Sequence, residues 1–208
     1  MADKNLLLVE GKDDVHVFSH LLKHYQIPKR FQIKDKEGIR NLLDTLSVEF
    51  KDSGVERLGI VVDADLDIQA RWQALRNILI KSGGVDVPTA PDLGGAIFSV
   101  ELPDRSLVVG VWIMPNNELS GMLESFVRFL VPADDSLWDR AADCLTRIPD
   151  QERRFPAAHQ IKAHVHTWLA WQEEPGTPLG LAITKRYLDA DAPHARQLMD
   201  WVCRLFGI

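Results

Sequence analysis

The feature of this sequence that most constrains its fold is a regular alternation over its first 84 residues. Short apolar runs at 6–9, 31–33 and 58–62 have the length of strands. Each is followed by a segment with apolar residues at helical spacing, over about 12–25, 38–50 and 68–81. The run at 58–62 is apolar throughout, as expected of a strand covered on both faces. This order predicts a parallel sheet flanked by helices.

The rest of the chain predicts two more strands and then helices. Strands at 96–101 and 107–114 are separated by a turn at 103–106, which indicates a hairpin and therefore a mixed sheet. Helical patterns follow at about 118–130, 136–148, 156–171 and 193–206. We predict an α/β fold with a mostly parallel sheet over 1–130 and a helical C-terminal extension, 131–208, packed on it. A single domain that includes both parts is the alternative.

Composition restricts the classes of protein to consider. The chain has 208 residues, 46% of them hydrophobic, which suits one or at most two domains. No apolar run is long enough to cross a bilayer, and no signal-peptide pattern is visible. Cys144 and Cys203 lack a paired spacing, which fits a reducing compartment and argues against zinc. These features predict a cytoplasmic protein without membrane contact.

The net charge of −6 bears on partners. A protein that holds long nucleic acid usually carries a basic stripe, because neutralising phosphates supplies most of the affinity. Only short basic clusters occur here. Nucleic acid is therefore expected to bind weakly, and a homo-oligomer or a partner protein that supplies basic surface stays open.

Acidic residues follow two of the predicted strands. Glu10 ends the first, and Asp63 ends the third, with Asp65 and Asp67 just beyond it. Ligand sites of parallel sheets lie beyond the carboxyl ends of the strands, and alternate residues of an extended chain point the same way, about 7 Å apart. We expect these acids to face one point, where oxygen ligands favour Mg²⁺ or Mn²⁺. The alternative is that each acid forms a turn or a helix cap, with Asp67 as the N-cap of the next helix.

Three further residues are candidates for the same site. Glu124 lies off the apolar face of its predicted helix, where it is either an outer metal ligand or half of a surface ion pair with Arg128. Lys12 and Lys162 are candidates for steadying a phosphate or a transition-state charge, and a solvated surface role is the alternative. The stripe of His16, His20 and His24 is expected on a solvated helix face.

Two short motifs carry a family resemblance. Leu8-Val-Glu-Gly-Lys-Asp-Asp14 resembles the first Toprim motif, and Ile60-Val-Val-Asp-Ala-Asp65 resembles the second, Asp-x-Asp. The pattern over nearly the whole chain, including Gly110-Val-Trp-Ile-Met-Pro115 and Trp168-Leu-Ala-Trp171, is similar to the DUF3226 type of small uncharacterised bacterial proteins with a Toprim-like fold. The resemblance implies a glutamate that acts as general acid or base and aspartates that bind Mg²⁺.

The chain also departs from the larger Toprim enzymes. Asp67 stands where topoisomerases carry a third aspartate, but the Pro and Glu-Gly that accompany it there are missing. From its length of 208 residues and its single predicted sheet, we expect neither a complete topoisomerase nor a complete primase. Among the Toprim enzymes, a stand-alone nuclease is the class that remains compatible with the sequence.

The resemblance and the carboxylates together predict a Mg²⁺- or Mn²⁺-dependent enzyme that acts on phosphodiesters. Its catalytic residues would be Glu10 and Lys12, and its metal ligands Glu10, Asp63, Asp65, Asp67 and Glu124. The alternative is a non-catalytic Toprim-like regulatory or interaction module that kept the acids. Asp-x-Asp also occurs in nucleotide-sugar transferases, but the Glu-Gly after the first strand argues against that class.

Overall fold

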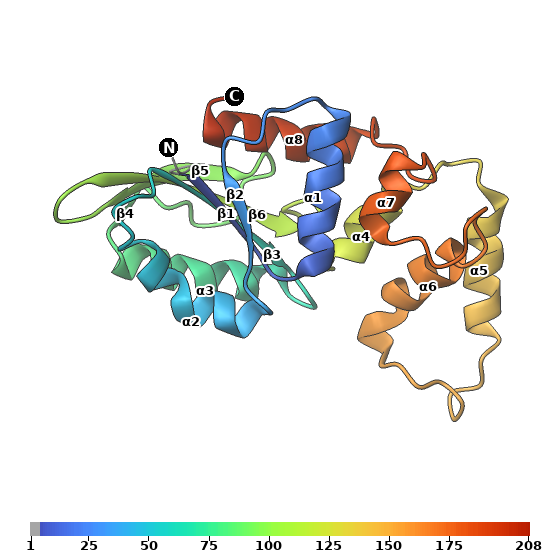
Figure 1. Ribbon diagram of the computed structural model, residues 1–208. Coiled ribbons are helices and arrows are strands. Elements are labelled where there is room, and N and C mark those ends of the chain that lie inside the picture. Colours follow the sequence, from blue (N-terminus) through green and yellow to red (C-terminus); the bar gives the residue numbers. More distant parts are fainter. Residues whose placement is uncertain (1–4) are drawn as a thin grey trace.

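The computed structural model describes residues 5–208, which form a six-stranded sheet with helices on both faces (Figure 1). The first part of the chain contains β1 (Asn5–Val9), α1 (Lys12–His24), β2 (Gln32–Asp35), α2 (Ile39–Glu49), β3 (Arg57–Asp63), α3 (Ile68–Lys81), β4 (Gly84–Val85), β5 (Ala96–Glu101) and β6 (Ser106–Met114). The second part contains α4 (Leu123–Arg128), α5 (Ser136–Thr146), the 3₁₀ turn η1 (Ala157–His159), α6 (Gln160–Leu169), α7 (Leu179–Thr184) and α8 (Pro193–Phe206).

The sheet is mostly parallel, as predicted. Its strand order is β2-β1-β3-β6-β5-β4, and the pairs among the first four strands are all parallel. β5 pairs antiparallel with β6, which confirms the hairpin. β4, which has two residues, was not predicted and pairs antiparallel with β5. The α/β fold class is therefore confirmed.

Each face of the sheet has its own apolar core. α1 and α8 cover one face, and α2 and α3 cover the other (Figure 1). Because successive side chains of a strand point to opposite faces, Leu7 of β1 packs in the first core and Leu8 in the second. β3 divides in the same way, with Val61 in the first core and Ile60 in the second. This division explains why residues 58–62 of β3 are all apolar.

The C-terminal helix packs directly on the sheet. A Cβ atom at Gly59 of β3 or Gly110 of β6 would lie 3.0 Å or less from Leu205 of α8, so only glycine allows this close approach. The Arg57 guanidinium also donates to the Leu205 carbonyl at 2.6 Å. α8 thus belongs to the same core as β3 and β6, and the domain boundary near residue 130 stays a prediction.

The segment after β6 differs from the prediction. The helix expected over 118–130 begins only at Leu123. Before it, the Asn117 side chain accepts from the Ile113 N–H at 2.7 Å, and the Asn116 side chain accepts from the Leu119 N–H at 2.9 Å. With these bonds the backbone N–H groups are satisfied by asparagine side chains, and the segment forms turns. A helix does not form here because asparagine side chains compete with helical hydrogen bonding.

Helix α7 was not predicted, and it changes the surroundings of α1. It packs along α1, where the His16 carbonyl lies against Gly180. His20 Nδ1 lies 2.6 Å from Thr184 Oγ1. His20 is therefore half-buried, and the expectation of a fully solvated histidine stripe is wrong at this position. A six-residue helix carries too short a pattern to be recognised from its sequence.

Candidate functional site: an acidic cleft

The site lies where the order of the parallel strands changes direction. β1 stands between β2 and β3 in the sheet, so the chain leaves β1 toward one side and returns on the other. Ligands of open α/β sheets bind at such a switch point, beyond the carboxyl ends of the strands. Glu10 follows β1 directly, and Asp63 is the last residue of β3. The Asp63 N–H donates to Glu10 Oε1 at 2.7 Å, so the structure brings these two residues together.

Both residues line a cleft of about 670 Å³, a volume typical of small-molecule sites. Its lining is dominated by acids: seven carboxylate residues face two lysines. The lining residues are Glu10, Gly11, Lys12, Asp13, Asp14, Asp35, Glu37, Gly38, Asp63, Leu123, Glu124 and Lys162.

Burial and mutual repulsion make the inner acids hard to ionise. Burial, followed by the charges of the neighbouring Glu10 and Asp14, raises the pKa of Asp63 to about 9. Burial, followed by the charge of Glu10, raises the pKa of Asp14 to about 7. The pKa of Glu10 is also raised, chiefly by burial. Without a cation, the cleft therefore retains protons at neutral pH.

Asp14 is a site residue that the sequence analysis missed. It lies in the first turn of α1, is 7% exposed, and its Oδ2 accepts from the Gly11 N–H at 3.1 Å. That bond closes the turn between Glu10 and the helix and directs Asp14 toward Glu10. The available signal was its position four residues after Glu10, inside the Toprim-like motif, on a helix that begins immediately after the strand.

Glu124 and Lys162 form the far wall of the cleft. The Glu124 side chain is 2% exposed, and Lys162 Nζ lies 2.7 Å from its Oε1. Although burial lowers it, the hydrogen bond to Glu124 leaves the pKa of Lys162 above its ordinary value. The interpretation of Glu124 as half of a surface ion pair with Arg128 is wrong, because α6 packs against α4 and covers it.

Asp65 does not line this cleft. Its φ of 54° breaks the extended geometry on which the prediction of convergence rested, and its N–H donates to the Gly121 carbonyl at 2.8 Å. Its carboxylate instead forms an ion pair with the Arg71 guanidinium, whose Nε donates to the Asp63 carbonyl at 2.8 Å. Asp65 is close enough to influence the pKa of Asp63, but it points toward α3.

Asp67 caps a helix, as the alternative interpretation proposed. Its Oδ1 accepts from the N–H groups of Gln69 and Ala70 at 2.9 and 3.0 Å, at the start of α3. These bonds satisfy two backbone donors that the helix cannot satisfy itself. The carboxylate of Asp67 is thereby engaged outside the cleft.

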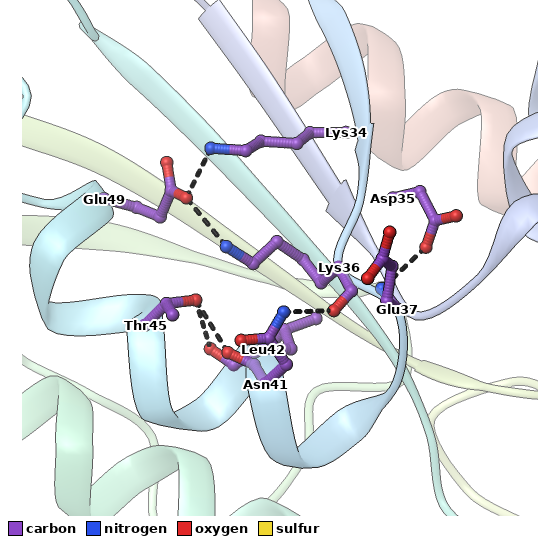
Figure 2. A network of polar contacts seen from close by, with 8 residues as sticks. All are labelled: Lys34, Asp35, Lys36, Glu37, Asn41, Leu42, Thr45 and Glu49. Carbon is purple, nitrogen blue, oxygen red and sulfur yellow. Dashed lines mark hydrogen bonds and ion pairs between the residues drawn. The ribbon is translucent and has the colours of Figure 1, made fainter.

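The last residue of β2, Asp35, and Glu37 in the loop before α2 are the outer acids of the cleft, and contacts on the far side of this loop hold it in place (Figure 2). The Lys36 N–H donates to the Val9 carbonyl, and the Gly38 N–H donates to the Glu10 carbonyl at 2.7 Å. Figure 2 shows the Lys36 side chain leaving the loop to meet Glu49 of α2, where Nζ and Oε1 are 2.8 Å apart. This buried ion pair holds the loop beside Glu10.

The donor chemistry of the cleft suits a hard cation, but its present arrangement is incomplete. Every ligand-type side chain that lines it is a carboxylate or an amine, and carboxylate oxygens are preferred by Mg²⁺ and Mn²⁺. Over residues 5–208, no three histidine, cysteine, aspartate or glutamate side chains are grouped so that they could hold a metal ion. Cation binding at this cleft would require its carboxylates to turn toward one point.

Fold and site define an α/β protein with an acidic cleft at the carboxyl edge of a mostly parallel sheet. The family model described as "Protein of unknown function (DUF3226)" matches residues 4–207, so the chain belongs to this family. The comparisons with curated proteins and with solved structures give no match. No helix in the described part of the chain has the length and apolarity required to cross a membrane.

Proposed function

We propose that the protein is a Mg²⁺- or Mn²⁺-dependent phosphotransfer enzyme of Toprim type, which acts on phosphodiesters in the manner of a nuclease. The observation that carries the proposal is the hydrogen-bonded pair of Glu10 and Asp63 at the switch point of the sheet, with Asp14 and Glu124 in the same cleft. Acids with strongly raised pKa values gather at functional sites more often than at structural ones.

Glu10, Asp14 and Asp63 would hold the cation, with Glu124 beside them. When bound, a divalent cation would neutralise these carboxylates and polarise a phosphoryl oxygen. Asp65 would join the ligands only after leaving Arg71, and Asp67 would stay in its place at the start of α3.

Two further roles are required: a general base that accepts a proton, and cations that balance the negative charge of the phosphate. Glu10 is the candidate general base, because its raised pKa brings its protonation equilibrium closer to neutral pH. Lys12 and Lys162 reach the cleft from α1 and α6, on two of its sides, where they would balance the charge of a phosphodiester. With a net charge of −6, the protein should bind nucleic acid weakly and with strong salt dependence.

The test combines a cation titration with a cleavage panel at low ionic strength. Mn²⁺ is expected to raise the thermal midpoint of the wild type and to support cleavage of some single- or double-stranded nucleic acid. Asp63→Asn should remove both effects. Glu10→Gln should remove cleavage and keep most of the stabilisation, because the amide retains an oxygen but cannot accept the proton.

Asp67→Asn is the matched control, because asparagine caps a helix as well as aspartate does. It should leave both effects intact. An equal Mn²⁺ response in the wild type and in Asp63→Asn would overturn the proposed site.

One observation favours the alternative function, a non-catalytic Toprim-like regulatory or interaction module. Leu66, 79% exposed, and Leu119, 49% exposed, flank the loops at the same edge of the sheet, where Ser120 Oγ donates to the Leu66 carbonyl. A contiguous exposed apolar patch marks a contact surface, and these two side chains would belong to such a patch. Intact Mn²⁺ stabilisation without cleavage of any substrate in the panel would favour this alternative.

A further inference from the structure

A second cavity lies far from the acidic cleft, at the amino ends of the parallel strands. It has a volume of about 600 Å³ and is formed by the ends of α2 and α3, which run side by side beneath the sheet in Figure 1, and by the turn between β5 and β6. Its lining residues are Leu43, Ser47, Phe50, Lys51, Ile78, Lys81, Ser82, Leu102 and Pro103. None of them lines the acidic cleft.

The lining combines an apolar floor with a cationic rim. Phe50 is buried, and Leu43, Ile78 and Leu102 are half-buried against the core of this face. Lys51 and Lys81 are exposed, and neither ammonium forms an ion pair within residues 5–208. No carboxylate lines the cavity, although the chain carries a net charge of −6. The cavity is thus a cationic and apolar site on an acidic protein.

The carboxyl end of α2 does not cancel this positive charge. The carboxyl end of a helix carries partial negative charge on its free carbonyl groups. At the end of α2, the Arg105 guanidinium donates to the Phe50 carbonyl at 2.8 Å and also to the Asp52 and Val55 carbonyls. With these carbonyls satisfied by a cation, Lys51 remains available to an incoming anion.

We propose that this cavity binds a small amphipathic anion, an alkyl or aryl carboxylate. Its apolar body would lie between Leu43 and Ile78, and its carboxylate would lie between Lys51 and Lys81. The volume is in the range of small-molecule sites, which are mostly apolar with a few polar groups that fix orientation. The site is independent of the proposed phosphotransfer function, since it shares no residue with the acidic cleft.

The experiment titrates the full chain with octanoate and, as its uncharged counterpart, 1-octanol, using calorimetry at low ionic strength. Octanoate should bind saturably at one site. Reversing both charges with Lys51→Glu and Lys81→Glu should weaken octanoate about tenfold and leave 1-octanol unchanged. Ser47→Trp, at an exposed position of the lining, should fill the cavity and weaken both ligands.

The control reverses two exposed lysines outside the cavity, Lys23→Glu and Lys29→Glu, which changes the net charge by the same amount. This pair should bind octanoate as the wild type does. The proposal is overturned if the control pair loses affinity as strongly as the cavity pair, if octanoate does not saturate, or if Ser47→Trp has no effect. A dimer that Ser47→Trp dissociates, without octanoate binding, would assign the cavity to a second copy and would also overturn it.

Discussion

Two regions of this molecule bury charged side chains next to each other, and they do so with opposite balance. Behind the β2–α2 loop, Glu49 meets two lysines, Lys34 and Lys36, at 2.6 and 2.8 Å (Figure 2). Burial alone would raise the pKa of Glu49, but the hydrogen bonds from the two lysines outweigh it and lower the pKa. The acidic cleft lies on the other side of the same loop, and there Asp63 and Asp14 have raised pKa values.

The difference separates a structural charge cluster from a candidate functional one. A buried carboxylate with enough cationic partners is already neutralised and needs nothing from outside the chain. In the acidic cleft Lys162 pairs with Glu124, and Lys12 is exposed, so within residues 5–208 no ion pair neutralises Glu10, Asp14 or Asp63. Such an arrangement opposes folding stability, and proteins tolerate that cost where function requires it. The predictions below test this contrast.

The largest effect is expected from breaking the balanced cluster. Glu49→Leu leaves Lys36 buried without its partner, so the free energy of unfolding should fall by about 3–5 kcal/mol. Urea denaturation measures this loss. In the double variant Lys36→Met with Glu49→Leu, no unpaired charge remains buried, and much of the stability should return. If the double variant lost as much unfolding free energy as the two single variants lose together, the structural role of the pair would be contradicted.

The next effect concerns cation binding at the unbalanced cluster. Mn²⁺ at about 100 times its dissociation constant should stabilise the wild type by about 2.7 kcal/mol. Asp14→Asn should remove a large part of this gain, because Asp14 belongs to the same acid cluster as Glu10 and Asp63. The gain should also increase as pH rises from about 7 to about 9, since protons and cations compete for these carboxylates. Thermal unfolding with and without Mn²⁺ measures it, and a pH-independent gain would contradict the assignment.

A smaller effect is expected from relieving the crowding without a cation. An unfolded aspartate releases its proton near pH 3.8, whereas folded Asp63 retains it to about 9, so the folded state binds more protons in between. The metal-free wild type should therefore lose stability as pH rises through this window. Asp63→Asn should flatten this dependence and be more stable at pH 9 by about 1–2 kcal/mol. Urea denaturation at pH 5, 7 and 9 measures it, and a variant less stable at pH 9 would contradict the repulsion.

The smallest effect distinguishes the helix cap from the acidic cleft. Asp67→Ala removes two accepted hydrogen bonds at the start of α3, so the free energy of unfolding should fall by about 1 kcal/mol. Asp67→Asn should change it by less than about 0.5 kcal/mol, because asparagine retains the cap. Both variants should keep the Mn²⁺ response of the wild type. A reduced response in Asp67→Asn would place Asp67 among the metal ligands after all.

The sequence by itself determined most of the helices and strands and the positions of two of the acids at strand ends. Apolar period and turn residues are local signals, and they placed α3 at Ile68–Lys81 and β5 at Ala96–Glu101 as the structure has them. The β-α alternation also put Glu10 and Asp63 at strand ends, and the parallel pairing of β1 with β3 places them side by side. These inferences needed no contact between distant parts of the chain.

The tertiary structure decided which acids share the cleft. Asp65 turns away because its backbone pairs with Gly121, more than fifty residues further along the chain, and adopts a positive φ. Glu124 is buried because α6 packs on α4 and brings Lys162 onto it. Side-chain direction and burial depend on contacts between segments distant in sequence, and the period of a single segment carries no information about them.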